Sequence, residues 1–158
     1  MFANRYTALV DACSLVDTMR RNLLLTLAEA EFFRVRWSVP IMEETERAIA
    51  RLAEGKGYAD AAARGSRARL AMERAFEEAS VRDFPDDILT PLNIEARNAD
   101  DFIADTIALD LGRAIPALRR MRKRLRVPPL EADRLLRDME ARGLIATADT
   151  LASFVRSL

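Results

Sequence analysis

The sequence predicts an α/β fold with a central parallel sheet, and three observations support that prediction. Residues 8–13 form an apolar run that indicates a buried strand, and residues 33–37 alternate between apolar and charged side chains, as a half-buried strand does. A segment with helical spacing of its apolar residues follows each run. The order strand, helix, strand, helix is typical of parallel sheets, in which a helix connects neighbouring strands.

The first two helices are predicted from apolar periodicity and from the residues that begin them. Residues 17–31 carry one apolar stripe at helical spacing: Met19, Leu23, Leu27 and Ala30. The next helix begins at Ser38, a good capping residue, and has Pro40 in its first turn. Its expected buried stripe is Ile41, Thr45, Ala48 and Leu52. A further helix, residues 60–80, follows the glycine-containing interruption at residues 55–57.

The second half of the chain is predicted to be mainly helical. The third strand candidate is residues 92–96, and helical stripes follow from residue 102 onward. Pro128 and Pro129 are expected to end one helix, Gly143 to end the next in the C′ position, and Thr147 to cap the last. We therefore expect a C-terminal helical subdomain from about residue 104.

Composition limits the chemistry that this chain can perform. It has 158 residues, of which half are hydrophobic and 32% are charged, which suits a packed core with a soluble surface. There is no histidine, so Ser-His-Asp, Cys-His and His-ligated metal chemistries are excluded. The single cysteine, Cys13, excludes an internal disulfide, and we expect it to be a small buried residue rather than a nucleophile. Catalysis would have to depend on carboxylates, hydroxyls, Lys or Arg.

Targeting and charge signals point to a cytoplasmic protein with one basic segment. No signal peptide is apparent, and the longest apolar stretch, residues 23–28, is far too short to span a bilayer. Residues 113–126 contain seven basic residues and no acid, whereas residues 95–110 contain five acids against Arg97 alone. This asymmetry indicates either a polyanionic or acidic partner, or a solvated helix beside an oppositely charged one.

Two acids are placed where a hard divalent cation could bind. Asp11 ends the first predicted strand, and Glu44 lies beside the buried stripe of the helix after the second strand. Ligands of open α/β sheets bind at the carboxyl ends of the strands, and carboxylates there suit Mg²⁺ or Mn²⁺. Two acids are too few for a complete site. Alternatively, Asp11 merely caps the next helix and Glu44 is favoured by the helix dipole.

Several segments together resemble PIN-domain proteins, and most closely the VapC-type toxins of bacterial toxin–antitoxin pairs. The segments that carry the likeness, which extends over most of the chain, are residues 10–15, 21–30, 33–38, 41–44 with Arg47, 70–76, 82–85 and 94–102. The basic segment with Pro128 and Pro129 resembles a C-terminal helical extension found in one branch. The resemblance implies a PIN-like three-layer fold over residues 1–103, followed by a helical extension over residues 104–158.

The resemblance also implies a function. It points to a magnesium- or manganese-dependent endoribonuclease that hydrolyses RNA phosphodiester bonds, is restrained by a cognate antitoxin, and forms a homodimer. Asp11 matches the first metal-binding acid of the family and Glu44 the second, while Ser14 could contact substrate or a metal-bound water. RNA phosphates or the antitoxin would be bound by four residues of the basic segment: Arg119, Arg122, Lys123 and Arg126.

The chain departs from the family between residues 81 and 82. A segment with two further acids, a helix and a strand is expected there, and roughly 30–45 residues are absent, about the size of a strand–helix crossover unit. If the protein contains a segment that this sequence lacks, a Cα separation well beyond the ~3.8 Å of a trans peptide is expected near this position. If the loss is real, the protein is an inactive remnant that binds only a partner or nucleic acid. Removing a core strand from a domain stable by only about 5–15 kcal/mol favours the first interpretation.

A third interpretation sets the acids aside. The chain would then be a helical adaptor or a nucleic-acid-binding module in which the basic segment carries the function.

Overall fold

The computed structural model describes residues 6–81, 95–126 and 128–158, and the chain divides into two compact units. The first unit comprises Met1–Thr18 and Arg34–Glu95, and the second comprises Met19–Phe33 and Ala96–Leu158. The predicted discontinuity between residues 81 and 82 involves a residue outside the described ranges.

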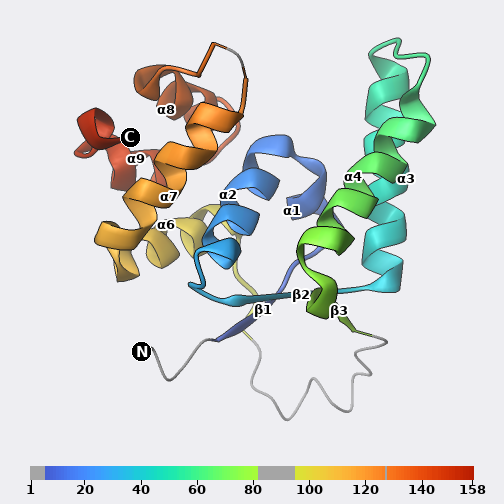
Figure 1. Cartoon of the computed structure of the whole chain (residues 1–158), viewed down its shortest axis with the longest axis horizontal. Coiled ribbons are helices and arrows are strands. Elements are labelled where there is room, and N and C mark those ends of the chain that lie inside the picture. The colour runs from blue at the N-terminus through green and yellow to red at the C-terminus, as the bar shows by residue number, and fades with distance from the viewer. Residues whose placement is uncertain (1–5, 82–94, 127) are drawn as a thin grey trace. The chain divides into compact units, whose positions relative to one another are not determined.

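A small parallel sheet forms the centre of the first unit (Figure 1). It contains β1 (Thr7–Leu9), β2 (Arg34–Ser38) and β3 (Ser80–Val81) in the order β1-β2-β3. Thr7 lies opposite Arg34 and Trp37 lies opposite Ser80, and both pairings are parallel. The parallel sheet is therefore confirmed for the described residues, whereas the three-layer arrangement of the PIN family stays a prediction.

The third strand of the described residues is β3, which lies outside the segment where a third strand was predicted. The strand predicted at residues 92–96 lies mostly outside the described residues, and Glu95 and Ala96 belong to no strand. The short 3-10 turn η1 (Glu77–Ala79) leads the chain into β3 beside β2. A strand of two residues has no alternation, so hydrophobic periodicity could not reveal it.

Helices α1 (Ala12–Val16), α3 (Val39–Gly55) and α4 (Ala61–Ala75) complete the described part of the first unit. As predicted, Ser38 caps α3: its hydroxyl accepts a hydrogen bond from the backbone N–H of Ile41 at 3.4 Å. The core between sheet and helices contains Trp37, which is fully buried and meets the Phe76 ring edge to face at 6.1 Å.

The buried face of α3 differs from the predicted stripe. Thr45 is fully buried, but Leu52 is 54% exposed, so its assignment to the core was wrong. The residues that α3 buries instead, together with Thr45, are Met42 and Ala53. The buried side of α3 is set by two neighbours, because α1 and α4 both pack against this helix. A single apolar stripe at i, i+4 spacing predicts burial against one neighbour only, so it does not identify this side.

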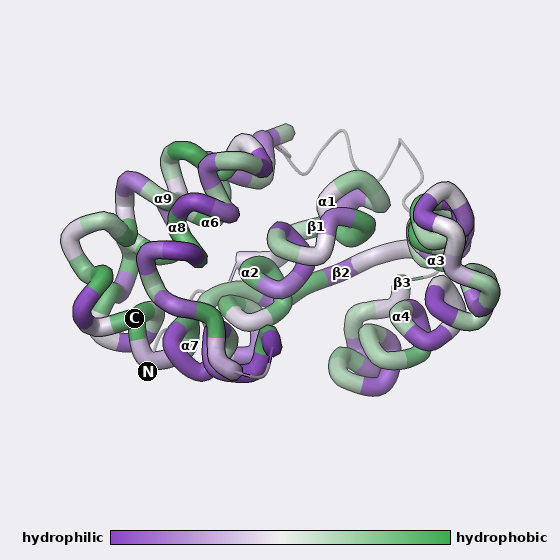
Figure 2. Tube along the Cα trace, turned by 90° about the horizontal axis from the view of Figure 1, so that it is seen from above, coloured by the Kyte–Doolittle hydropathy of each residue, from purple (hydrophilic) through white to green (hydrophobic). Residues whose placement is uncertain are grey.

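The described residues of the second unit form five helices: α2 (Thr18–Glu29), α6 (Ala99–Leu109), α7 (Leu111–Arg124), α8 (Ala132–Glu140) and α9 (Ile145–Ala152), with a last 3-10 turn η3 (Val155–Ser157). Their core contains the following fully buried side chains: Leu23, Leu27, Ile103, Ile107, Leu118, Leu135, Met139, Leu144 and Leu151. Hydrophilic residues recur along α7 between apolar ones, as Figure 2 shows, so this helix is amphipathic. The predicted helical nature of the C-terminal third is confirmed.

Helix ends in the second unit follow the sequence signals in part. Gly143 has a positive φ of 76° after α8, which confirms its predicted C′ role. Thr147 does not cap the last helix, because α9 already begins at Ile145 and Thr147 is fully buried in its first turn. The cap is Asp100, which comes from α6.

The two compact units do not coincide with the two expected domains. Helix α2 belongs to the second unit although it precedes β2 in the sequence, and the expected boundary between residues 103 and 104 falls inside α6. Compact units are defined by contacts and family domains by ancestry, so the expected domain division stays a prediction. Among the described residues, no helix combines the length and apolarity that a membrane span requires.

Candidate functional site

Asp11 lies at the carboxyl end of the first strand. The backbone N–H of Val10 donates to the carbonyl of Arg36 at 2.9 Å, so the β1–β2 pairing extends to the residue before Asp11. Asp11 then caps α1, and its Oδ1 accepts a hydrogen bond from the backbone N–H of Ser14 at 3.0 Å. The side chain is exposed. This geometry holds the carboxylate in a defined orientation while leaving it accessible to solvent.

Glu44 lies in the second turn of α3 and is exposed beside the fully buried Thr45. The helix dipole acts mainly on the first turn, so this position gives little support to the dipole interpretation. The side chain of Glu44 makes no ion pair or hydrogen bond with a described residue. Because α1 packs against α3, Asp11 and Glu44 come from contacting elements of one unit, and their convergence on a single ion stays a prediction.

The donor chemistry fits a hard cation only in part. Asp11 and Glu44 offer carboxylate oxygens, the ligand type of Mg²⁺ and Mn²⁺, and Mg²⁺ often keeps several waters and takes oxygens from substrate phosphates. In the part of the chain that the structure describes, however, no group of three or more Asp, Glu, Cys or His side chains could hold a metal ion. The two acids therefore form at most half of the ligand set that the family resemblance implies.

Two small residues of α1, Cys13 and Ser14, follow Asp11 in the sequence. Ser14 is half-buried, and its backbone N–H is engaged by Asp11, which places its hydroxyl one turn from that carboxylate. Cys13 is exposed, so the expectation of a buried residue was wrong. The inner face of α1 is occupied by Ala12 and Leu15, and residue 13 therefore points elsewhere.

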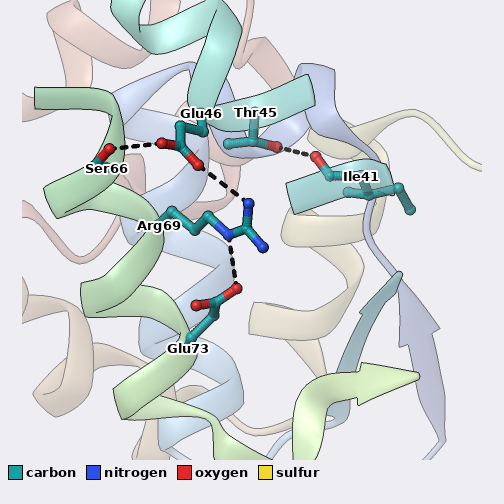
Figure 3. A network of polar contacts seen from close by, with 6 residues as sticks. All are labelled: Ile41, Thr45, Glu46, Ser66, Arg69 and Glu73. Atoms are coloured by element: carbon teal, nitrogen blue, oxygen red, sulfur yellow. Dashed lines mark hydrogen bonds and ion pairs between the residues drawn. The ribbon is translucent and has the colours of Figure 1, made fainter. Parts of the chain in front are cut away.

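A polar network joins α3 to α4 (Figure 3). Glu46 accepts hydrogen bonds from the Ser66 hydroxyl at 2.6 Å and from Arg69 Nη1 at 3.1 Å, and Arg69 Nε donates to Glu73 at 2.8 Å. The hydrogen bonds from Ser66 and then Arg69 lower the pKa of Glu46. Ser66 and Arg69 are three residues apart and therefore lie on one face of α4, from which both reach Glu46.

The helices of this network approach each other closely at Gly65. A Cβ atom at this position would lie 2.5 Å from the carbonyl oxygen of Glu46 and 3.3 Å from the Cβ of Ala50. Glycine is therefore required for this packing of α4 on α3, and the network beside it fixes how the two helices are aligned.

The predicted RNA- or partner-binding residues of the basic segment have two different surroundings. Arg119 donates to the carbonyl of Ser157 at 2.6 Å, and Arg122 donates to the carbonyls of Leu158, at 3.0 Å, and Leu130. These two arginines thus hold the C-terminal turn on α7. The side chains of Lys123 and Arg126 are exposed and make no hydrogen bond or ion pair with a described residue.

Asp100 has a structural role that the sequence analysis did not identify. Its carboxylate accepts hydrogen bonds from the backbone N–H groups of Ala146 and Thr147, both at 2.8 Å, and from the Thr147 hydroxyl at 2.7 Å. Burial raises the pKa of Asp100, but these hydrogen bonds, together with that of Ile145, outweigh it and lower the pKa overall. Because its oxygens are committed to α9, Asp100 is not a candidate metal ligand.

Comparison with known proteins finds a relationship for the C-terminal helices. Residues 99–153, which span α6 to α9, match the model of the family described as VapC50 C-terminal domain. The match covers about a third of the chain. No curated protein and no solved structure matches the chain. The C-terminal helices are thus similar to the C-terminal domain of a VapC-family toxin.

Proposed function

We propose that this protein is a VapC-type toxin, a metal-dependent endoribonuclease that hydrolyses RNA phosphodiester bonds and is restrained by a cognate antitoxin. The observation that carries the proposal is the match of residues 99–153 to the VapC50 C-terminal domain. The position of Asp11, at the end of a strand in a parallel sheet, supports it because ligands of such sheets bind at that edge.

In this proposal Asp11 and Glu44 hold Mg²⁺ or Mn²⁺. When bound, such an ion supplies a water of lowered pKa and stabilises negative charge on the phosphoryl oxygens. Asp11 is oriented for this role by the Ser14 amide, which fixes one carboxylate oxygen. Glu44 is presented from α3 with no competing partner among the described residues. The Ser14 hydroxyl would contact substrate or a water. We also expect a cytoplasmic homodimer.

Cleavage of a short fluorogenic RNA by the full-length chain tests the proposal. We expect cleavage with Mg²⁺ or Mn²⁺, none with EDTA, and a loss of about 100-fold or more in Asp11→Asn and Glu44→Gln, since even residues outside the ligand shell of a metal site cost 10–100-fold. Glu43→Gln is the matched control, because Glu43 is an exposed neighbour of Glu44 on the same helix. Cleavage that survives EDTA or Asp11→Asn would contradict the metal site.

A specific observation favours one alternative, an inactive PIN-like remnant that only binds a partner or nucleic acid. The described residues hold no group of three metal-ligating side chains, and Asp11 already serves as a helix cap. In this case the wild-type chain cleaves no RNA with either metal. Sequencing the encoding DNA across codons 80–83 separates the active nuclease from the inactive remnant, because the gene of a functional nuclease is expected to encode a further segment there.

A further inference from the structure

The basic residues of α7 and its end separate into an inner and an outer group. The inner group, Arg113, Arg119 and Arg122, is used within the second unit: Arg113 donates to the carbonyl of Ala30 and lies 4.8 Å above the Phe32 ring, and the other two bind C-terminal carbonyls. The outer group is exposed and consists of Arg120, Lys123, Arg124 and Arg126. Only the outer group is available for a ligand.

Two members of the outer group line a pocket between α2 and α7. Its volume is about 220 Å³, and its lining residues are Thr26, Glu29, Ala30, Ala117, Arg120 and Arg124. Arg124 lies 3.7 Å from Glu29, with both side chains about 65% exposed, so this ion pair contributes little stability. The side chain of Arg120 makes no hydrogen bond or ion pair with any described residue.

The charges of the pocket are not balanced. Arg120 and Arg124 are one helical turn apart, and like charges at this spacing destabilise a helix. Glu29 offsets only one of the two positive charges. The pocket therefore has a net charge of +1, which a single monoanion neutralises. Guanidinium groups bind carboxylates and phosphates with paired hydrogen bonds, so the ligand is one of these two groups.

The remaining surface favours a nucleic-acid phosphate over the carboxylate of a protein partner. Protein interfaces depend on large apolar or aromatic anchors, whereas the apolar lining of this pocket consists of two alanines, Ala30 and Ala117. Lys123 and Arg126 add further exposed positive charge, and no acid occurs from residue 113 to residue 126. A phosphodiester carries one negative charge and repeats it along the strand, which matches such a row of cations.

We propose that the pocket between α2 and α7 binds a backbone phosphate of an RNA strand through Arg120 and Arg124, independently of base sequence. The inference rests on the proposed function in taking RNA as the substrate. It deepens that proposal by assigning RNA binding to residues of the basic segment other than Arg119 and Arg122, which hold the C-terminal turn.

Fluorescence anisotropy with a labelled single-stranded RNA of about 12 nucleotides tests the pocket without cleavage, because the full chain is measured in EDTA over a range of salt concentrations. Losing the one phosphate contact reduces the magnitude of the slope of log K against log salt by about 0.7, which corresponds to about 5-fold weaker binding at ~0.1 M salt. We expect this loss in the double variant Arg120→Gln/Arg124→Gln. The control is Arg137→Gln, which replaces an exposed arginine of α8 whose side chain makes no hydrogen bond or ion pair with a described residue.

A second variant distinguishes loss of the pocket from loss of the fold, because misfolding cannot produce the tighter binding that it is expected to show. Glu29→Gln removes the one acid among the described residues that line the pocket, so we expect tighter RNA binding and a steeper salt dependence. An unchanged slope in the double variant, an equal loss in Arg137→Gln, or unchanged affinity in Glu29→Gln would overturn the proposal.

Two further outcomes distinguish RNA binding from binding of an acidic protein, and the pocket proposal from the nuclease proposal. If the double variant loses binding to a labelled polyglutamate peptide but keeps its RNA affinity, the pocket belongs to an acidic protein partner and the proposal is wrong. If wild type cleaves no RNA with metal but binds it through Arg120 and Arg124, the nuclease proposal fails and the pocket stands.

Discussion

Replacement of Asp100 by alanine tests how strongly the second unit depends on one carboxylate. Asp100 accepts three hydrogen bonds from the start of α9, at 2.7 to 2.8 Å, and one of the donors is the fully buried Thr147 hydroxyl. The variant removes the acceptor for two backbone N–H groups that have no partner inside the helix. It also removes the shortest acceptor of the buried hydroxyl, which keeps only a longer contact of 3.3 Å to the carbonyl oxygen of Asp100.

The expected cost follows from these contacts. Loss of a capping side chain destabilises by about 1 kcal/mol. A buried hydroxyl left without a good partner adds about 1–3 kcal/mol, and here the low end applies because the 3.3 Å contact remains. We therefore expect Asp100→Ala to lower the free energy of unfolding by about 2–3 kcal/mol, which is about 5–10 °C in Tm for a chain of this size. Asp100→Asn keeps one acceptor oxygen and should cost about 1 kcal/mol.

Thermal and urea unfolding at neutral pH, followed by circular dichroism, measure these differences. Asp149→Asn is the matched control, since Asp149 is an exposed residue of α9, and its change should stay within about 0.5 kcal/mol. If Asp100→Ala unfolds no more easily than this control, the argued role of the carboxylate is wrong.

The same residue gives a pH dependence with a defined sign. The pKa of folded Asp100 lies below its ordinary value of 3.8, so the unfolded chain takes up a proton first as the pH falls. The stabilisation by the ionised carboxylate is complete above pH 3.8 and is lost as the pH falls through the folded pKa. The stability difference between wild type and Asp100→Asn should thus shrink below about pH 4. A difference that stays constant down to pH 2 would refute the assignment.

Two further predictions concern α4. Gly65→Ala gains about 1 kcal/mol of helix propensity, but its Cβ would lie 2.5 Å from the Glu46 carbonyl oxygen, and this overpacking costs about 1–3 kcal/mol. We therefore expect a net loss of stability in urea unfolding, and a more stable variant would contradict the close approach of the helices. Hydrogen bonds from Arg67 and then Arg64 lower the pKa of Asp60 to about 2, and a carboxyl ¹³C NMR titration should show this midpoint in wild type and a return toward 3.8 in Arg67→Gln/Arg64→Gln, whereas an ordinary midpoint in wild type would show that these bonds do not form in solution.

Local signals of the sequence were sufficient for most helices and for two strands. The apolar stripe of residues 17–31 became α2, and the alternation of residues 33–37 became β2, because both patterns reflect burial along a single element. Ser38 and Gly143 were identified correctly because each acts on a helix end that lies next to it in the sequence. The sequence therefore predicted these elements, whose formation depends on residues close to them in the chain.

Long-range contacts were not accessible in the same way. The cap of α9 comes from Asp100, 47 residues before Thr147, and nothing in the neighbourhood of Thr147 indicates it. Leu52 is apolar and correctly spaced, yet it remains exposed because the partners of α3 lie on another face. For the candidate site, the sequence located Asp11 at a strand end, but it left open whether this residue caps α1 or binds a metal, and the structure shows the cap.

The assignment of α2 to the second compact unit has a consequence for synthesis and for fragment design. The chain leaves the first unit after Thr18, returns to it at Arg34 and leaves it again at Ala96. On the ribosome the apolar face of α2 emerges roughly sixty residues, or several seconds at ~5–20 residues per second, before its C-terminal partners. A fragment that ends before α6 would leave the apolar face of α2 exposed to water. A fragment that begins at α6 would need a separate peptide of residues 19–33 to form the second unit.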